Sequence, residues 1–174
     1  MRERKREMTR SYLSGGEQTT INSTITELFP ALAFNTSAKF RSTSELETYI
    51  RNLNLSGIKA SKTFVNSGNI DAATKSIDKL DLIRPSIKDT KLKNAIGILN
   101  YLYEYNKKRK IEKVIWGYRE KPKGVPNNHA GDIFIVHADK KVKPNIVGIS
   151  LKAGTKSSKE PKLNSYVGTT LRKD

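Results

Sequence analysis

The stretch of sequence that decides the fold is residues 131–152, GDIFIVHADKKVKPNIVGISLK. It contains two apolar runs, residues 132–138 and 146–152, which are separated by a charged turn with a proline. Each run has the length and the β-branched content of a buried strand, and the short turn favours an antiparallel hairpin. The start of the first strand then lies beside the end of the second. We therefore expect Asp132 and Lys152 at the same end of a sheet.

Further elements are expected on both sides of this hairpin. Residues 113–118 predict a strand before it, so that three strands form a meander, and residues 90–110 carry the strongest helical pattern. That helix ends in Lys107–Lys110, which suits either the negative end of the helix dipole or contact with DNA. A short helix is expected over residues 162–171.

The N-terminal part of the chain is predicted to be helical. Apolar residues recur at helical spacing in residues 17–28, 44–55 and 69–82. Pro30 discourages continuation of the first of these helices. Ser44 and Glu47, three residues apart, predict a capping box at the start of the second.

These patterns predict an α/β fold, with a short mixed β-sheet flanked by helices and an N-terminal helical region. We divide the chain into a basic arm (1–16), a helical region for DNA recognition or dimerisation (17–86) and a core (87–174). The arm is interpreted either as a phosphate-binding tail or as a solvated terminus.

The composition points to a polyanionic partner and to oxygen ligands for any metal. Lys and Arg number 33 against 17 Asp and Glu, a net charge of +16, and nucleic acid is the commonest partner for such an excess. The alternative is a very soluble protein without that partner. The chain has no cysteine and only two histidines, so disulfides and His-rich zinc sites are disfavoured. A catalytic metal would be Mg²⁺ or Mn²⁺.

The sequence favours an intracellular, reducing setting. No apolar run approaches the length that crosses a membrane. The first residues, MRERKREMTR, lack the apolar segment of a secretory signal.

Asp132 and Lys152 have the chemistry that phosphodiester hydrolysis needs. The reaction requires a divalent cation, a polarised water and a positive group near the developing charge. A Lys at the end of an apolar strand must either extend to water or meet an anion. Gly131 and Gly154 would leave room for backbone and substrate to approach.

Gly131-Asp132-Ile133 and Ile149-Ser150-Leu151-Lys152 resemble the two halves of the PD-(D/E)XK nuclease signature. The resemblance covers roughly residues 88–174 and implies a restriction-endonuclease-like core. Three features depart from the family pattern. Gly131 replaces its proline, Ser150 replaces its acidic residue, and residues 155–174 leave little length for a further strand. The core would then be minimal, be completed by a partner chain, or belong to a longer protein.

The resemblance implies a metal-dependent deoxyribonuclease. Asp132 and the carbonyl of Leu151 would bind Mg²⁺, Lys152 would orient the attacking water, and Ser150 would hydrogen-bond a metal-bound water. The carboxylate that Ser150 lacks would come from Glu160, whose other interpretation is a loop acid among lysines.

A helix-borne glutamate often adds a metal ligand in this superfamily. Glu17 is the preferred match because Ser14-Gly15-Gly16 precedes it, although a helix N-terminus favours a Glu in any case. Glu27 is the second choice and Glu104 a distant third.

Several cations would hold the DNA backbone and make binding salt-dependent. These residues are Lys121, Lys123, Lys156, Lys159 and Lys162, with His129 as a loop residue that contacts phosphate or is purely structural. Double-strand cleavage by one-site chains would need a homodimer. A phage or mobile-element endonuclease fits the size and charge.

Two other classes of function stay open. One is a non-catalytic basic nucleic-acid-binding protein with a degenerate nuclease fold. The other is a small structural protein whose charge serves assembly.

Overall fold

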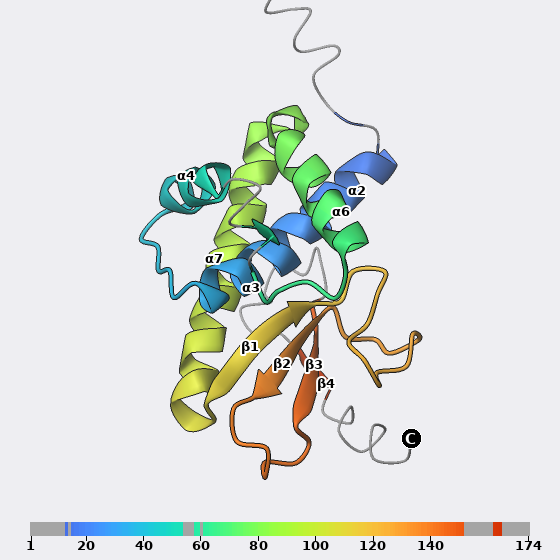
Figure 1. Cartoon of the computed structure of the whole chain (residues 1–174). Helices are drawn as coiled ribbons and strands as arrows, with labels where there is room; N and C mark the ends of the chain where they lie inside the picture. Colours follow the sequence, from blue (N-terminus) through green and yellow to red (C-terminus); the bar gives the residue numbers. More distant parts are fainter. Residues whose placement is uncertain (1–12, 14, 54–57, 60, 152–161, 165–174) are drawn as a thin grey trace, which may run out of the picture.

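The computed structural model describes residues 13, 15–53, 58, 59, 61–151 and 162–164 (Figure 1). The helical elements are α2 (Gly15–Ser23), η1 (Thr24–Leu28), α3 (Phe29–Asn35), α4 (Thr43–Asn52), α6 (Ser67–Asp78), η2 (Leu80–Leu82) and α7 (Pro85–Lys108). The strands are β1 (Ile111–Trp116), β2 (Ile133–His137), β3 (Ile146–Ser150) and β4 (Lys162–Asn164). The fold is therefore mixed α/β, with one small sheet and helices beside it.

The sheet is a meander in the order β1-β2-β3-β4. The predicted hairpin is confirmed, because β2 and β3 pair antiparallel with Ile133 opposite Ile149. The prediction of a mixed sheet is wrong for the part of the chain that the structure describes, where every strand pair is antiparallel. The turn between β2 and β3, residues 138–145, is too short for the crossover that parallel strands need. Residues 162–164 pair with β3, so the predicted helix does not begin at Lys162; residues 165–171 lie outside the described ranges.

One face of the sheet packs against the helices and forms the main core. Alternate residues of the strands point to this face, as the pleat requires. They meet buried side chains of α2, η1, α3, α4 and α7 in a single cluster. The strand residues in this cluster are Val114, Trp116, Ile133, Ile135 and Ile149. The helical region and the strands therefore share one hydrophobic core.

The opposite face of the sheet is centred on the fully buried ring of Phe134. Three glycines leave the space that this ring occupies. A Cβ added at Gly117 would lie 2.5 Å from the ring, one at Gly131 2.9 Å, and one at Gly148 3.0 Å. The space at Gly131, predicted to admit substrate, is therefore filled by Phe134.

The first helical segment does not end before Pro30. α2, η1 and α3 follow one another without a break, and η1 is a π-helical segment. Pro30 stands in the first turn of α3, where the missing N–H of proline is tolerated. The π segment also rotates the residues after it relative to a regular α-helix. The apolar residues that predicted this helix, Ile21, Ile25 and Leu28, are nevertheless all buried in the core.

The N-cap of α4 is Ser42, two residues earlier than the predicted Ser44. The hydroxyl of Ser42 accepts a hydrogen bond from the Glu45 N–H, and the Glu45 carboxylate accepts one from the Arg41 N–H. These contacts replace the expected pair of Ser44 and Glu47. Glu47 is instead the centre of an ion-pair group between helices.

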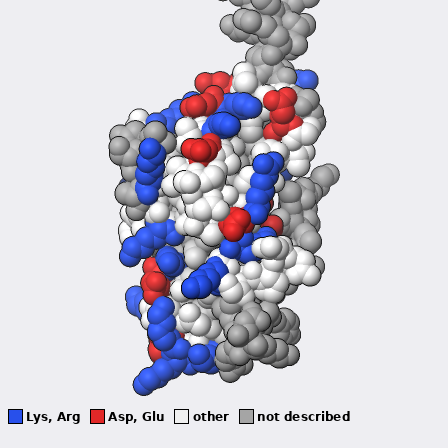
Figure 2. All heavy atoms as spheres, turned by 45° about the vertical axis from the view of Figure 1, so that its right-hand side comes forward, with Lys and Arg blue, Asp and Glu red and all other residues white. Residues whose placement is uncertain are grey.

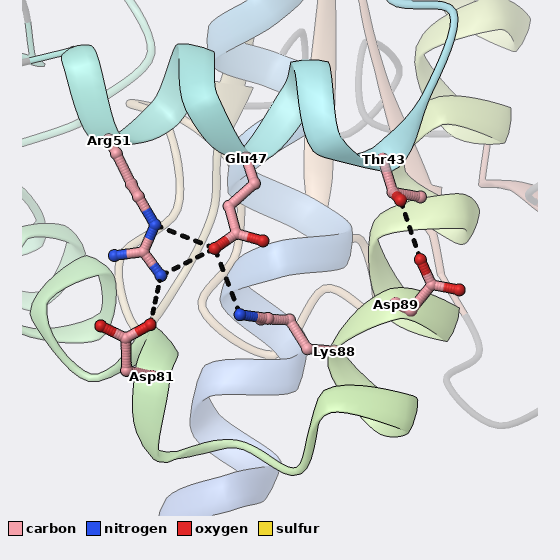
Figure 3. Close-up of polar contacts among 6 residues, drawn as sticks. All are labelled: Thr43, Glu47, Arg51, Asp81, Lys88 and Asp89. Atoms are coloured by element: carbon pink, nitrogen blue, oxygen red, sulfur yellow. Dashed lines mark hydrogen bonds and ion pairs between the residues drawn. The ribbon is translucent and has the colours of Figure 1, made fainter.

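That group connects α4 to η2 and α7 (Figure 3). The Glu47 carboxylate lies 2.7 Å from Arg51 and 3.2 Å from Lys88, and Arg51 also reaches Asp81 at 2.7 Å. Thr43 donates to Asp89 at 2.8 Å a short distance away. Because Glu47 is bound to cations, it has a structural role and is no candidate for the catalytic site.

Candidate functional site

Asp132 lies at the end of the sheet where β2 begins and β3 ends. Its backbone N–H donates to the Ile149 carbonyl at 2.8 Å. Its carboxylate accepts a hydrogen bond of 2.7 Å from the backbone N–H of Leu151. These two contacts hold the carboxylate against the end of β3, beside Leu151, the residue before Lys152 in the sequence. Lys152 itself lies outside the described residues.

The second carboxylate at this place belongs to Glu27, from the π-helical segment η1. The Trp116 indole N–H donates to Glu27 at 3.2 Å, which connects the helix to the last residue of β1. Trp116 is fully buried, so this hydrogen bond fixes where the Glu27 side chain lies. Trp116 was not among the predicted site residues.

Glu27 and Asp132 are close enough to influence each other's charge. Burial, together with the negative charge of Asp132, raises the pKa of Glu27 from 4.5 to about 8; the Trp116 hydrogen bond and the positive charge of Lys121 act in the opposite direction. A carboxylate pair with such a pKa binds either a proton or a cation near neutral pH. The pair therefore has the electrostatics of a cation site.

Lys121 is the cation that acts on Glu27 from the loop after β1. Its ammonium donates to the carbonyls of Gly117 at 3.2 Å and Gly131 at 2.9 Å. These bonds connect the two chain segments that flank the candidate site. Lys121 was predicted to hold the DNA backbone, and the structure places it beside the carboxylates.

His129 and Ser150 lie close to the same end of the sheet. The His129 ring nitrogen Nδ1 accepts from the Gly131 N–H at 2.9 Å, and the ring lies 5.4 Å from that of Phe134. Burial, followed by the charge of Lys121, lowers the pKa of His129. This favours the neutral ring and the structural interpretation of His129. Ser150 is buried at the end of β3.

Glu17, the preferred helix ligand in the sequence prediction, lies elsewhere. It is in the first turn of α2, and its carboxylate is 3.8 Å from the Lys79 ammonium. Ten residues separate it from Glu27, a rise of roughly 15 Å in a helix. The structure thus brings the second choice, Glu27, beside Asp132.

The other predicted site residues lie farther out or are not described. Glu104 is exposed on α7 and pairs with Lys107 at 2.8 Å. Lys123 is exposed in the loop after β1. The strand β4 includes Lys162, whose side chain is not described, and Lys156, Lys159 and Glu160 fall outside the described ranges.

The donor set suits Mg²⁺, which typically binds proteins through one or two carboxylates and retains several waters. Glu27 and Asp132 supply two such carboxylates, both from positions held by hydrogen bonds. Within residues 15–53, 58, 59, 61–151 and 162–164, no group of three or more His, Cys, Asp or Glu side chains could enclose a metal.

Basic side chains gather at the opposite end of the sheet. Figure 2 shows Lys and Arg predominating over the lower part of the molecule, where α7 ends and β1 starts in Figure 1. The exposed cations of these segments and of the β2–β3 turn are Lys107, Lys108, Arg109, Lys110, Lys140, Lys141 and Lys143.

Among the helices in the described ranges, none is both long and apolar enough to cross a membrane.

No family model matches the chain, and neither the curated proteins nor the solved structures contain a match.

Proposed function

We propose that the protein is a metal-dependent endonuclease that hydrolyses DNA phosphodiester bonds at Glu27 and Asp132. One observation carries the proposal. A carboxylate of the PD-(D/E)XK-like hairpin and a carboxylate of a preceding helix lie together at one end of the sheet, and burial and mutual repulsion raise the pKa of Glu27 to about 8. Two neighbouring carboxylates attract a divalent cation.

Each residue has a distinct part in this proposal. Glu27 and Asp132 would hold Mg²⁺, which when bound polarises the phosphate and lowers the pKa of a bound water. Trp116 and the Leu151 N–H position the two carboxylates. Lys152, which follows Leu151 in the chain, would orient the attacking water.

The reaction is a hydrolysis in which water is the second reactant and no oxidant takes part. The water oxygen forms a bond to phosphorus as the bond from phosphorus to one ester oxygen breaks. The departing oxygen takes a proton and leaves as a hydroxyl, and the other product is a phosphate monoester. Lys121, beside Glu27, adds positive charge to the region in which the negative charge of the phosphate increases.

Conversion of supercoiled plasmid to nicked or linear DNA in Mg²⁺ tests the proposal. Glu27→Gln, Asp132→Asn and Lys152→Ala should each reduce cleavage by at least 100-fold, the scale of loss for a group that acts on the transition state. Glu104→Gln removes an exposed carboxylate of α7 and should cleave like the wild type. Equal cleavage by the Glu27, Asp132 and Glu104 variants would exclude this site.

A non-catalytic nucleic-acid-binding protein is the second candidate. It is favoured by the absence of a third ligating side chain beside Glu27 and Asp132 in the described ranges, and by Ser150 at the acidic position of the motif. On this alternative the wild type binds DNA but leaves the plasmid intact in both Mg²⁺ and Mn²⁺. DNA binding without cleavage would therefore support the non-catalytic protein over the nuclease.

A further inference from the structure

A pocket opens between α2, α6 and the loop that follows β1. Its volume is about 470 Å³, within the range of small-molecule sites. Its wall includes charged side chains from three elements and one aromatic ring. Those that matter here are Glu17, Asp71, Lys75, Lys79, Tyr118 and Arg119. None of the roles proposed above uses this pocket.

An aromatic stack connects the pocket to the carboxylate pair. The Tyr118 ring lies parallel to that of Trp116, with centroids 4.8 Å apart and an interplanar angle of 9°. The indole N–H of Trp116 donates to Glu27 at 3.2 Å. The pocket and the carboxylates therefore lie close to the same buried indole ring, that of Trp116.

Arg119 adopts a backbone conformation that is unusual for its residue type. Its φ is 59°, in the left-handed region that favours glycine. The guanidinium lies over the Tyr118 ring, 4.9 Å from its centroid. Strained residues concentrate at binding sites, where the surrounding structure maintains them for a function. Here the strained conformation places a cation and an aromatic ring side by side at the pocket.

The charges of the pocket suit a nucleotide. Lys75, Lys79 and Arg119 give it three cations against the two carboxylates of Glu17 and Asp71. Figure 2 shows this mixture of both signs over the upper part of the molecule, where α2 and α6 lie in Figure 1. Cations bind phosphate, carboxylates accept from the amino groups of bases, and a planar guanidinium such as that of Arg119 stacks on the base.

We infer that this pocket binds one unpaired nucleotide of the strand whose phosphodiester lies at Glu27 and Asp132. The base stacks on the guanidinium of Arg119, whose opposite face covers Tyr118. Lys75, Lys79 and the in-plane N–H groups of Arg119 contact its phosphate. A base inside a duplex is paired and stacked, so it enters such a pocket only from a single strand, a flap or a gap. The inference rests on the proposed function and specifies its substrate as DNA with an unpaired nucleotide beside the cleaved bond.

Fluorescence of Trp116, the only tryptophan of the chain, provides a direct measurement of binding. Titrations use Asp132→Asn protein in EDTA, so that no strand is cut. The probes are deoxyadenosine monophosphate, a single-stranded oligonucleotide and a blunt duplex of the same sequence. We expect the mononucleotide to change the emission, and the single strand to bind at least 10-fold more tightly than the duplex.

Substitutions in the pocket should weaken binding without unfolding the protein. Lys79→Gln and Arg119→Gly, each in the Asp132→Asn background, should raise the Kd for the single strand by about 10-fold, the loss typical of one charge-assisted phosphate contact. Arg119→Gly also removes the left-handed strain, so its melting temperature should not fall. Lys93→Gln removes a lysine that pairs with an acidic residue as Lys79 does, but on α7, and should leave the affinity unchanged.

The pocket and the cleavage activity can fail separately. If the mononucleotide leaves the Trp116 emission unchanged, the pocket inference is overturned even when the wild type cleaves DNA. It is also overturned if the pocket variants bind the single strand as tightly as the Lys93→Gln variant does. If the wild type binds the mononucleotide through these residues but cuts no DNA in Mg²⁺, the pocket stands and the nuclease proposal fails. Equal cleavage of a blunt duplex and of a substrate with an unpaired segment would also contradict the pocket.

Discussion

Replacing Glu27 by Gln should stabilise the protein while it removes the proposed cation site. In the folded chain the pKa of Glu27 is raised from 4.5 to about 8 by burial and by the nearby Asp132 carboxylate. Glutamine has a similar shape, carries no charge, and offers the Trp116 indole N–H the same carbonyl-type acceptor. The substitution therefore removes the repulsion and keeps the hydrogen bond.

The size and sign of the effect follow from proton linkage. A carboxyl group whose pKa is raised on folding contributes its full stability below pH 4.5, and this contribution is lost as the pH rises to about 8. The loss amounts to roughly 3 kcal/mol at pH 7 and up to about 5 kcal/mol above pH 8. Glu27→Gln has no carboxyl group to ionise at this position, so its stability does not fall in this way as the pH rises. In a domain of this size it should melt roughly 6–12 °C above the wild type at pH 7 in EDTA.

Thermal melts of both proteins between pH 4 and pH 9 in EDTA test this reasoning. The difference in melting temperature should be near zero at pH 4 and should grow steadily towards pH 8. Because all other titrating groups are common to the two proteins, the difference isolates Glu27. Millimolar Mg²⁺ at pH 8 should then stabilise the wild type and not the variant. If the wild type and Glu27→Gln melt at the same temperature at pH 8 as well as at pH 4 in EDTA, the raised pKa of Glu27 is refuted.

Two further predictions concern the packing that positions the site. Gly117→Ala should destabilise the protein by about 1–3 kcal/mol in urea unfolding, because its Cβ would lie 2.5 Å from the Phe134 ring. Gly97→Ala, in α7 with open space around the Cβ, should stabilise it by up to about 1 kcal/mol, and a loss of equal size in both variants would contradict the steric explanation. Asn35→Ala should lower stability by about 2–4 kcal/mol, since the side-chain amide of Asn35 bonds both the N–H and the carbonyl of Val114; an unchanged urea midpoint would show that these bonds contribute nothing.

The strands were predictable because their signal is local. The apolar runs that became β2 and β3, and the short charged turn between them, lie within 22 consecutive residues, 131–152. A hairpin needs no contact with the rest of the chain to set its direction. The position of Asp132 beside the end of β3 followed from the same reasoning, and its hydrogen bond with the Leu151 N–H confirms it.

The choice between Glu17 and Glu27 could not be made from the pattern of the helix. Glu17 follows two glycines, the feature that makes it resemble the helix-borne glutamate of the PD-(D/E)XK superfamily. Glu27 stands beside the apolar run that begins at Leu28. The sequence signal that favoured Glu27 was its charge next to a buried segment, because a charged side chain is seldom buried unless it has a partner. The π segment η1 weakens that signal, because it changes the direction of the side chains relative to regular helical spacing.

The amino-acid sequence by itself determined the hairpin, its acidic first residue, the excess of positive charge and the exclusion of thiolate ligands. These properties depend on composition and on neighbours a few residues apart. Tertiary structure alone decided which carboxylate joins Asp132, because Glu27 and Asp132 are separated by more than a hundred residues and meet only when η1 packs against β1 through Trp116. It also decided that Tyr118 and Arg119 meet Lys75 and Lys79 at one pocket, since burial of the common core brings α6 and the loop after β1 together.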